Sequence, residues 1–147
     1  MDLLQGSTGD PEGGDPVLVR ANGIVNYVLS AAVDDGSDHI TQIVRGIDLM
    51  RLSATQSQIR GALNLTNDQV HAHLPVLVNA QGQKLSKQAL APKIDDKLAS
   101  QNLIEILSLI DIDLAPDHPR ALLDQALKQF DISKFKGLRE LKLPIDQ

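Results

Sequence analysis

The chain has 147 residues, of which 42% are hydrophobic, so it is long and apolar enough to form a domain with a buried core. Its net charge of −5 excludes a protein that binds nucleic acid through its overall charge, and the absence of cysteine excludes a disulfide framework and a thiolate zinc site. No apolar run approaches the ~18 residues of a membrane-spanning helix and the N-terminus does not resemble a signal peptide, so we expect a cytoplasmic protein.

Residue periodicity and turn signals divide the first part of the chain into short elements. Apolar residues at helical spacing predict helices, and short apolar or β-branched runs between turn residues predict strands. The elements expected on this basis are, in chain order, a loop over residues 6–16, a strand over 17–20, a helix over 24–32, a strand over 40–44, a helix over 53–63 and a buried strand over 74–78.

Two of these elements have recognisable ends. Asn22-Gly23 is a strong turn signal directly after the first strand. Ser53 is expected to cap the second helix, in which Ile59, Ala62 and Leu63 share the face that should pack on the core.

The pattern changes near residue 97. The segments expected there are an amphipathic helix over residues 97–110, a Pro-containing linker over 113–119 and a helix that begins at Pro119 or Arg120 and ends near Phe130. Residues 132–147 show no clear period. The sequence therefore predicts an α/β half-domain over residues 1–92, followed by an α-helical subdomain over 93–147.

A loop with two lysines follows the buried strand. Residues 79–88 read Asn-Ala-Gln-Gly-Gln-Lys-Leu-Ser-Lys-Gln, so that Lys84 and Lys87 flank the pair Leu85-Ser86. Two mobile cations beside a hydroxyl group suit a loop that binds a polyphosphate, with Leu85 as its anchor. An exposed lysine-rich loop without a ligand is the alternative interpretation.

Other sequence blocks stand around this loop in a characteristic order. They are Tyr27 followed by Val33-Asp34-Asp35, then Arg45-Gly46-Ile47-Asp48, then His73-Leu74-Pro75, and finally Ala89-Leu90-Ala91-Pro92 after the loop. In this order and spacing the chain resembles the class I glutamyl-tRNA synthetases, and within them the glutamyl-Q tRNA(Asp) synthetases. The resemblance covers roughly residues 2–130. It implies the second half of a Rossmann-like catalytic domain, followed by a small helical subdomain.

The resemblance assigns an ATP site to the lysine loop. Lys84, Leu85, Ser86 and Lys87 match the second ATP signature of the family. Lys84 and Lys87 would be the catalytic residues, because their charges stabilise the pyrophosphate as glutamate attacks the α-phosphate. ATP with Mg²⁺ as its counterion is the implied cofactor, without a zinc site.

The resemblance assigns a glutamate site to Tyr27 and Arg45. The phenol of Tyr27 would donate a hydrogen bond to a substrate carboxylate, and the guanidinium of Arg45 would pair with a carboxylate. The alternatives are a core tyrosine with a satisfied hydroxyl group, and a surface salt bridge from Arg45 to Asp34, Asp35 or Asp48.

Two further polar pairs are interpreted as structural. Asp34-Asp35 falls at the end of a helix, where a capping or structural role is expected. His71 and His73 alternate on one strand, but no third ligand accompanies them, so we expect no metal site.

By resemblance, the full enzyme activates glutamate with ATP and transfers it to tRNA, in the nearest branch to the queuosine base of tRNA(Asp). The family's first ATP signature, a His-Ile-Gly-His-type loop, does not occur in these 147 residues, so we expect the chain alone to be inactive. Two alternatives stay open. Against this interpretation stand a non-catalytic remnant, and one piece of a split synthetase that binds nucleotide or RNA only with a separate N-terminal half.

Overall fold

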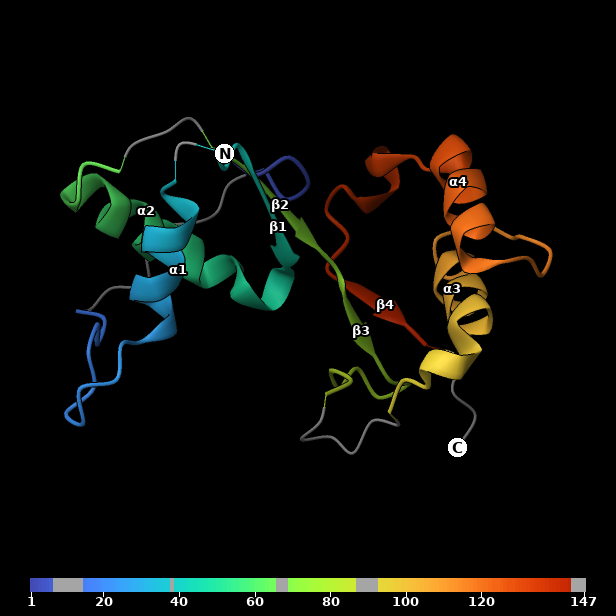
Figure 1. Ribbon diagram of the computed structural model, residues 1–147, viewed down its shortest axis with the longest axis horizontal. Helices are drawn as coiled ribbons and strands as arrows, with labels where there is room; N and C mark the ends of the chain where they lie inside the picture. Colours follow the sequence, from blue (N-terminus) through green and yellow to red (C-terminus); the bar gives the residue numbers. More distant parts are fainter. Residues whose placement is uncertain (7–14, 38, 66–68, 87–92, 144–147) are drawn as a thin grey trace. The chain divides into compact units, whose positions relative to one another are not determined.

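A computed structural model of the chain describes residues 1–6, 15–37, 39–65, 69–86 and 93–143. The chain divides into two compact units, Met1–Pro75 and Val76–Gln147 (Figure 1). Each unit combines helices with a two-stranded parallel sheet, which confirms the expected mixed α/β class. The domain boundary expected near residue 92 stays a prediction. Within the described ranges, no helix has the length and apolar character to cross a bilayer.

The first unit is built around one parallel strand pair. Its elements are α1 (Tyr27–Asp35), β1 (Gln42–Gly46), a 3₁₀-helix (Ile47–Leu49), α2 (Met50–Ala62) and β2 (Val70–Leu74). Helix α2 connects β1 to β2, as a parallel pair requires, and α1 packs against α2. In the register of the pair, Arg45 lies opposite His73.

Helix α1 begins later than its apolar pattern predicted. The expected start at Ile24 is wrong, because the segment before Tyr27 folds back on itself as an extended turn. The N–H of Arg20 donates to the carbonyl of Ile24, and the N–H of Asn26 donates to the carbonyl of Leu18, each at 2.8 Å. The turn at Asn22-Gly23 is confirmed, with Gly23 at a φ of 81°.

The strands also differ from their expected bounds. Strand β1 lies two residues later than the predicted range 40–44, so that Arg45 is inside the strand rather than after it. The single strand expected over 74–78 is two strands, β2 and β3 (Val76–Val78), on either side of Pro75. Proline has no N–H to donate to a ladder, which explains the interruption there.

Helix α2 buries a polar face, contrary to expectation. It begins at Met50, so Ser53 lies inside the helix and does not cap it. The buried residues of the helix are Met50, Ser53, Gln56 and Arg60, whereas Leu63, expected in the core, is 47% exposed. Side chains at these positions share one helical face, and the hydrogen bonds of Gln56 with Arg45 and of Ser53 with His73 join this face to the sheet.

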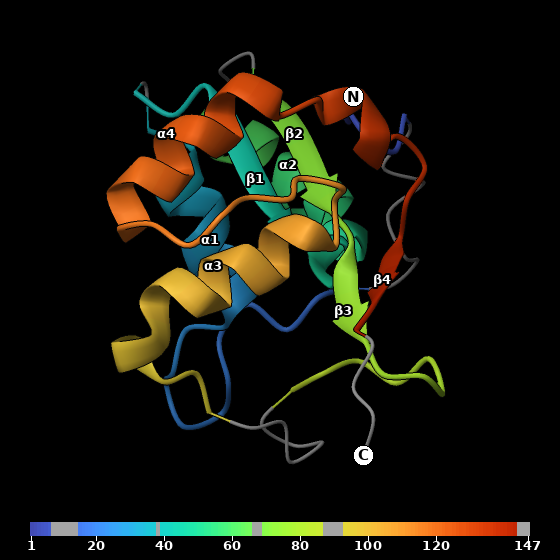
Figure 2. The same cartoon turned by 90° about the vertical axis from the view of Figure 1, so that its right-hand side faces the viewer.

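The second unit contains the two helices that the sequence predicted. Its elements are β3, a 3₁₀-helix (Asp96–Leu98), α3 (Ala99–Ser108), α4 (Pro119–Gln129), a 3₁₀-helix (Ile132–Phe135) and β4 (Glu140–Lys142). Helices α3 and α4 lie side by side, as Figure 2 shows. One cluster of buried apolar residues in this unit consists of Leu107, Ile112 and Ala126. The tail, which showed no period, supplies β4 as the parallel partner of β3.

Candidate functional site

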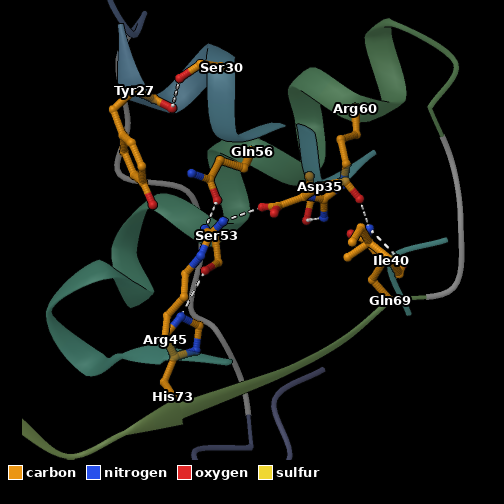
Figure 3. Close-up of polar contacts among 11 residues, drawn as sticks. Tyr27, Ser30, Asp35, Ile40, Arg45, Ser53, Gln56, Arg60, Gln69 and His73 are labelled. Atoms are coloured by element: carbon orange, nitrogen blue, oxygen red, sulfur yellow. Dashed lines mark hydrogen bonds and ion pairs between the residues drawn. The ribbon is translucent and has the colours of Figure 1, made fainter. Parts of the chain in front are cut away.

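The side chain of Arg45 is held between two helices of the first unit (Figure 3). It forms an ion pair with Asp35 at the end of α1, and its Nη1 donates to Oε1 of Gln56 in α2 at 2.6 Å. Only 12% of the Arg45 side chain is exposed. The ion pair with Asp35 is one of the alternatives considered for Arg45, but it is largely buried rather than on the surface.

Tyr27 lies next to this guanidinium group. The Cζ atom of Arg45 is 6.0 Å from the centroid of the Tyr27 ring, which is at the limit of a cation–π contact. Tyr27 is the first residue of α1 and is 47% exposed, so it does not point into the core. The structure therefore brings together the two residues to which the sequence assigned a glutamate site.

Arg45 keeps hydrogen-bonding capacity for a ligand. A guanidinium group has five N–H donors in a planar fork. Two of them have acceptors among the described residues, one on Asp35 and one on Gln56. The group can therefore still offer donors to a carboxylate, next to a phenol that can donate a further hydrogen bond.

A fully buried polar chain lies beside this site on the same face of the sheet. Asp2 Oδ2 is 2.5 Å from Nδ1 of His73, and Ser53 Oγ is 3.1 Å from Nε2 of the same ring. None of these three residues is more than 1% exposed. The order of carboxylate, imidazole and hydroxyl group is that of a serine nucleophile with its base. No substrate can reach a hydroxyl group that is buried in this way. The hydrogen-bonded row Asp2–His73–Ser53 is therefore a structural connection between α2, β2 and the N-terminus.

The buried polar residues on this face of the β1–β2 pair form a layer, in which burial and hydrogen bonding shift the pKa values of Asp2 and His71. Burial acts to raise the pKa of Asp2, but hydrogen bonds from His73 and from the N–H groups of Gln5 and Leu4 outweigh it and lower that pKa. The pKa of His71 is lowered, first by burial and then by the charge of Arg60. We conclude that the buried carboxylate is ionised and that His71 is neutral near pH 7.

The layer also contains buried polar atoms that have no hydrogen-bond partner among the described residues. They are Gln56 Nε2, Arg60 Nη1, Gln69 Oε1 and His71 Nδ1. Sequence reasoning missed the roles of Asp2, Gln56 and Arg60. The polar spacing of Ser53, Gln56 and Arg60 on one helical face was a usable signal, whereas nothing in the sequence pointed to Asp2.

The lysine loop belongs to the second unit. Asn79 Oδ1 accepts hydrogen bonds from the N–H groups of Gln81 and Gln83, and Gly82 has a φ of 78°, so the chain makes a tight turn here. The chain then returns to β3, where the N–H of Leu85 donates to the carbonyl of Leu77 at 2.9 Å.

The side chains of the loop differ in exposure. Lys84 is exposed, and Leu85 and Ser86 are half-buried, as expected of a loop that Leu85 anchors. Lys87 lies outside the described residues. In the described part of the chain, no group of three or more His, Asp or Glu residues is placed to hold a metal ion.

Comparisons with known proteins agree on one family. Residues 3–108 match the family described as tRNA synthetases class I (E and Q), catalytic domain. A glutamyl-Q tRNA(Asp) synthetase of Neisseria meningitidis (serogroup A) is 42% identical over 123 residues, which cover 82% of this chain and 41% of that protein. Proteins with the same name from Acinetobacter baylyi and Methylococcus capsulatus are 43% and 34% identical, over 82% and 95% of this chain.

The chain spans less than half the length of these relatives, between 41% and 48%. Their names describe enzymes that act on tRNA(Asp).

Proposed function

The chain belongs to the catalytic-domain family of class I tRNA synthetases for glutamate and glutamine, and on that premise we propose that it supplies the glutamate pocket and the lysine loop of a glutamate-activating ligase. The family match covers residues 3–108, which include both features. The matched relatives are named glutamyl-Q tRNA(Asp) synthetases, so we propose a queuosine base of tRNA(Asp) as the acceptor of the glutamate.

The observation that carries this proposal is the meeting of Tyr27 and Arg45. They come from different elements, α1 and β1, yet the guanidinium carbon lies 6.0 Å from the tyrosine ring. Arg45 offers a planar cation and Tyr27 offers a neutral donor beside it. This pairing suits a ligand with a carboxylate at the end of its side chain.

The chemistry requires few proton transfers from the protein. The pocket holds glutamate so that its α-carboxylate meets the α-phosphate of ATP, and positioning of this kind lowers the entropy cost of the reaction. Lys84 and Lys87 stabilise the charge that develops on the pyrophosphate, with Mg²⁺ as the counterion of ATP. The activated glutamate then passes to the tRNA.

The proposal includes three further features of the family. They are a Rossmann-like arrangement for residues 1–92, a helical subdomain for residues 93–147 and a cytoplasmic location. The first ATP signature would come from a complementing first half of the catalytic domain. Val44, in the middle of β1, is 60% exposed, which favours an arrangement in which further structure covers this strand.

A titration of the ¹⁵N-labelled 147-residue chain with glutamate tests the pocket. We expect the backbone signal of Tyr27 and the Nε–Hε signal of Arg45 to shift together, and Arg45→Gln to abolish the shift of the Tyr27 signal. Glutamine, which has the same shape without the charge, serves as the control ligand and should cause much smaller shifts. Shifts that avoid Tyr27 and Arg45, or a complete absence of shifts, would contradict the assignment.

A further inference from the structure

We propose that Gln56 positions Arg45 for an acidic ligand, and that the neutrality of Gln56 contributes to the preference for a carboxylate over an amide. This inference rests on the proposed function, because it takes the Tyr27–Arg45 pair as the glutamate pocket. It adds a positioning residue that lies on a third element, α2.

The first argument is the geometry of the Arg45 side chain. Asp35 binds Nη2 from one helix and Gln56 binds Nη1 from another, so the two ends of the fork are held separately. Because arginine has only donors, the atom of Gln56 that faces it must be Oε1. Two anchors on different nitrogens fix both the place and the plane of the guanidinium group.

The second argument is that Gln56 is itself held in place. Ser53, one helical turn earlier on the same face of α2, contacts His73 at 3.1 Å. His73 is the register partner of Arg45 across the β1–β2 pair, and Asp2 holds the other side of its ring. Helix α2 is therefore joined to both strands, to β2 through Ser53 and to β1 through Gln56.

The third argument is that only one end of the buried Gln56 amide has a hydrogen-bond partner among the described residues. Gln56 is completely buried, yet its Nε2 has no acceptor among the described residues. A buried amide donor without an acceptor is destabilising. An apolar side chain of the same size would avoid this cost, so the contact between Oε1 and Arg45 is the physical reason for an amide at this position.

The fourth argument concerns charge. Arg45 and Arg60 carry two positive charges in this layer, and Asp35, which acts on both of them, carries one negative charge. These three groups therefore carry one net positive charge, and the ionised Asp2 carboxylate of the same layer is hydrogen-bonded to His73. A neutral acceptor at position 56 orients Arg45 without cancelling that charge, whereas a second carboxylate would orient it equally well and repel an incoming carboxylate.

The test compares Gln56→Glu with Gln58→Glu in the 147-residue chain. Position 58 is exposed on the same helix, so the control adds the same charge away from the layer. Dissociation constants for glutamate and for glutamine come from NMR titrations. We expect Gln56→Glu to lower the ratio of glutamate to glutamine affinity by at least about tenfold, and Gln58→Glu to change it by less than about twofold.

Gln56→Met provides a measurement that needs no ligand. Methionine keeps a similar length but removes the acceptor, so we expect the Arg45 Nε–Hε signal to broaden and to exchange faster with solvent than in the parent chain. An unchanged signal would overturn the positioning role, and an equal loss of affinity for both ligands in Gln56→Glu would overturn the role in specificity. A parent chain that binds no glutamate would instead contradict the proposed function, and the Arg45 signal would still test the positioning.

Discussion

Arg45 and His73 lie opposite each other across the parallel strands β1 and β2, and each is hydrogen-bonded to the same helix, Arg45 through Gln56 and His73 through Ser53. The proposed ligand-binding cation and a buried structural histidine are thus held by one polar helical face. Substitutions in the buried row Asp2–His73–Ser53 should therefore affect the proposed glutamate pocket.

Removal of the Arg45 charge should destabilise the first unit. Arg45→Gln leaves the Asp35 carboxylate, which is 19% exposed, without its partner. We expect a loss of about 2 kcal/mol in the free energy of unfolding, less than the ~3–5 kcal/mol of a fully buried pair. Urea denaturation measures it. The double variant Arg45→Gln/Asp35→Asn should recover most of the loss, and additive losses would show that the two groups are not coupled.

The Asp2–His73 contact should make stability depend on acidic pH. The pKa of Asp2 is lowered from its usual 3.8 in the folded chain, so the unfolded chain binds a proton first as the pH falls. The stabilisation is present above the unfolded value and is lost as the pH falls through the folded value. Asp2→Asn should be less stable at pH 7, and its stability should change less between pH 5 and pH 2. A stability profile of Asp2→Asn against pH that runs parallel to that of the parent chain would contradict this.

His71 should add a second pH dependence in a higher range. Its pKa is lowered below the usual 6.5, first by burial, so the folded chain resists protonation. Stability should be greatest above pH 6.5 and should fall as the pH drops from there toward the folded pKa. His71→Phe, which keeps a ring stacked on His73, should flatten this part of the thermal denaturation profile. The same substitution at exposed His39 should leave the profile unchanged.

The lysine loop should act on the rate of adenylate formation rather than on glutamate binding. In a chain completed by a first catalytic half, Lys87→Ala should slow adenylate formation by on the order of 100-fold, because a loop cation stabilises charge that develops in the transition state. Lys84→Ala should act in the same direction. Lys93→Ala, an exposed lysine after the loop, is the matched control. Equal rates for Lys87→Ala and Lys93→Ala would remove the loop from the mechanism.

The sequence predicted the elements with regular apolar patterns and the strong turn signals. Helices α3 and α4 and the Asn22-Gly23 turn were found where expected. The inner face of α2 was not predicted correctly, because its polar residues are buried by partners on β1 and β2 that are distant in the chain. Periodicity reports local preference, and such tertiary contacts override it.

The candidate site was predicted only in part for the same reason. The resemblance named Tyr27 and Arg45 but could not show that Gln56 orients the guanidinium group. Asp2 reaches His73 across 71 residues of sequence, and no local pattern encodes such a contact. Strand β4 was missed because three residues are too few to show an alternating pattern.

The central claim is that this chain supplies the glutamate pocket and the lysine loop of a glutamate-activating enzyme. Its most direct test joins the first half of the catalytic domain of the Neisseria meningitidis relative to residue 1 and measures ATP–pyrophosphate exchange. We predict exchange that depends on glutamate and not on glutamine, that is lost in Arg45→Gln, and that neither half shows alone. A folded hybrid that binds ATP but shows no glutamate-dependent exchange, or full exchange by the 147-residue chain alone, would contradict the account.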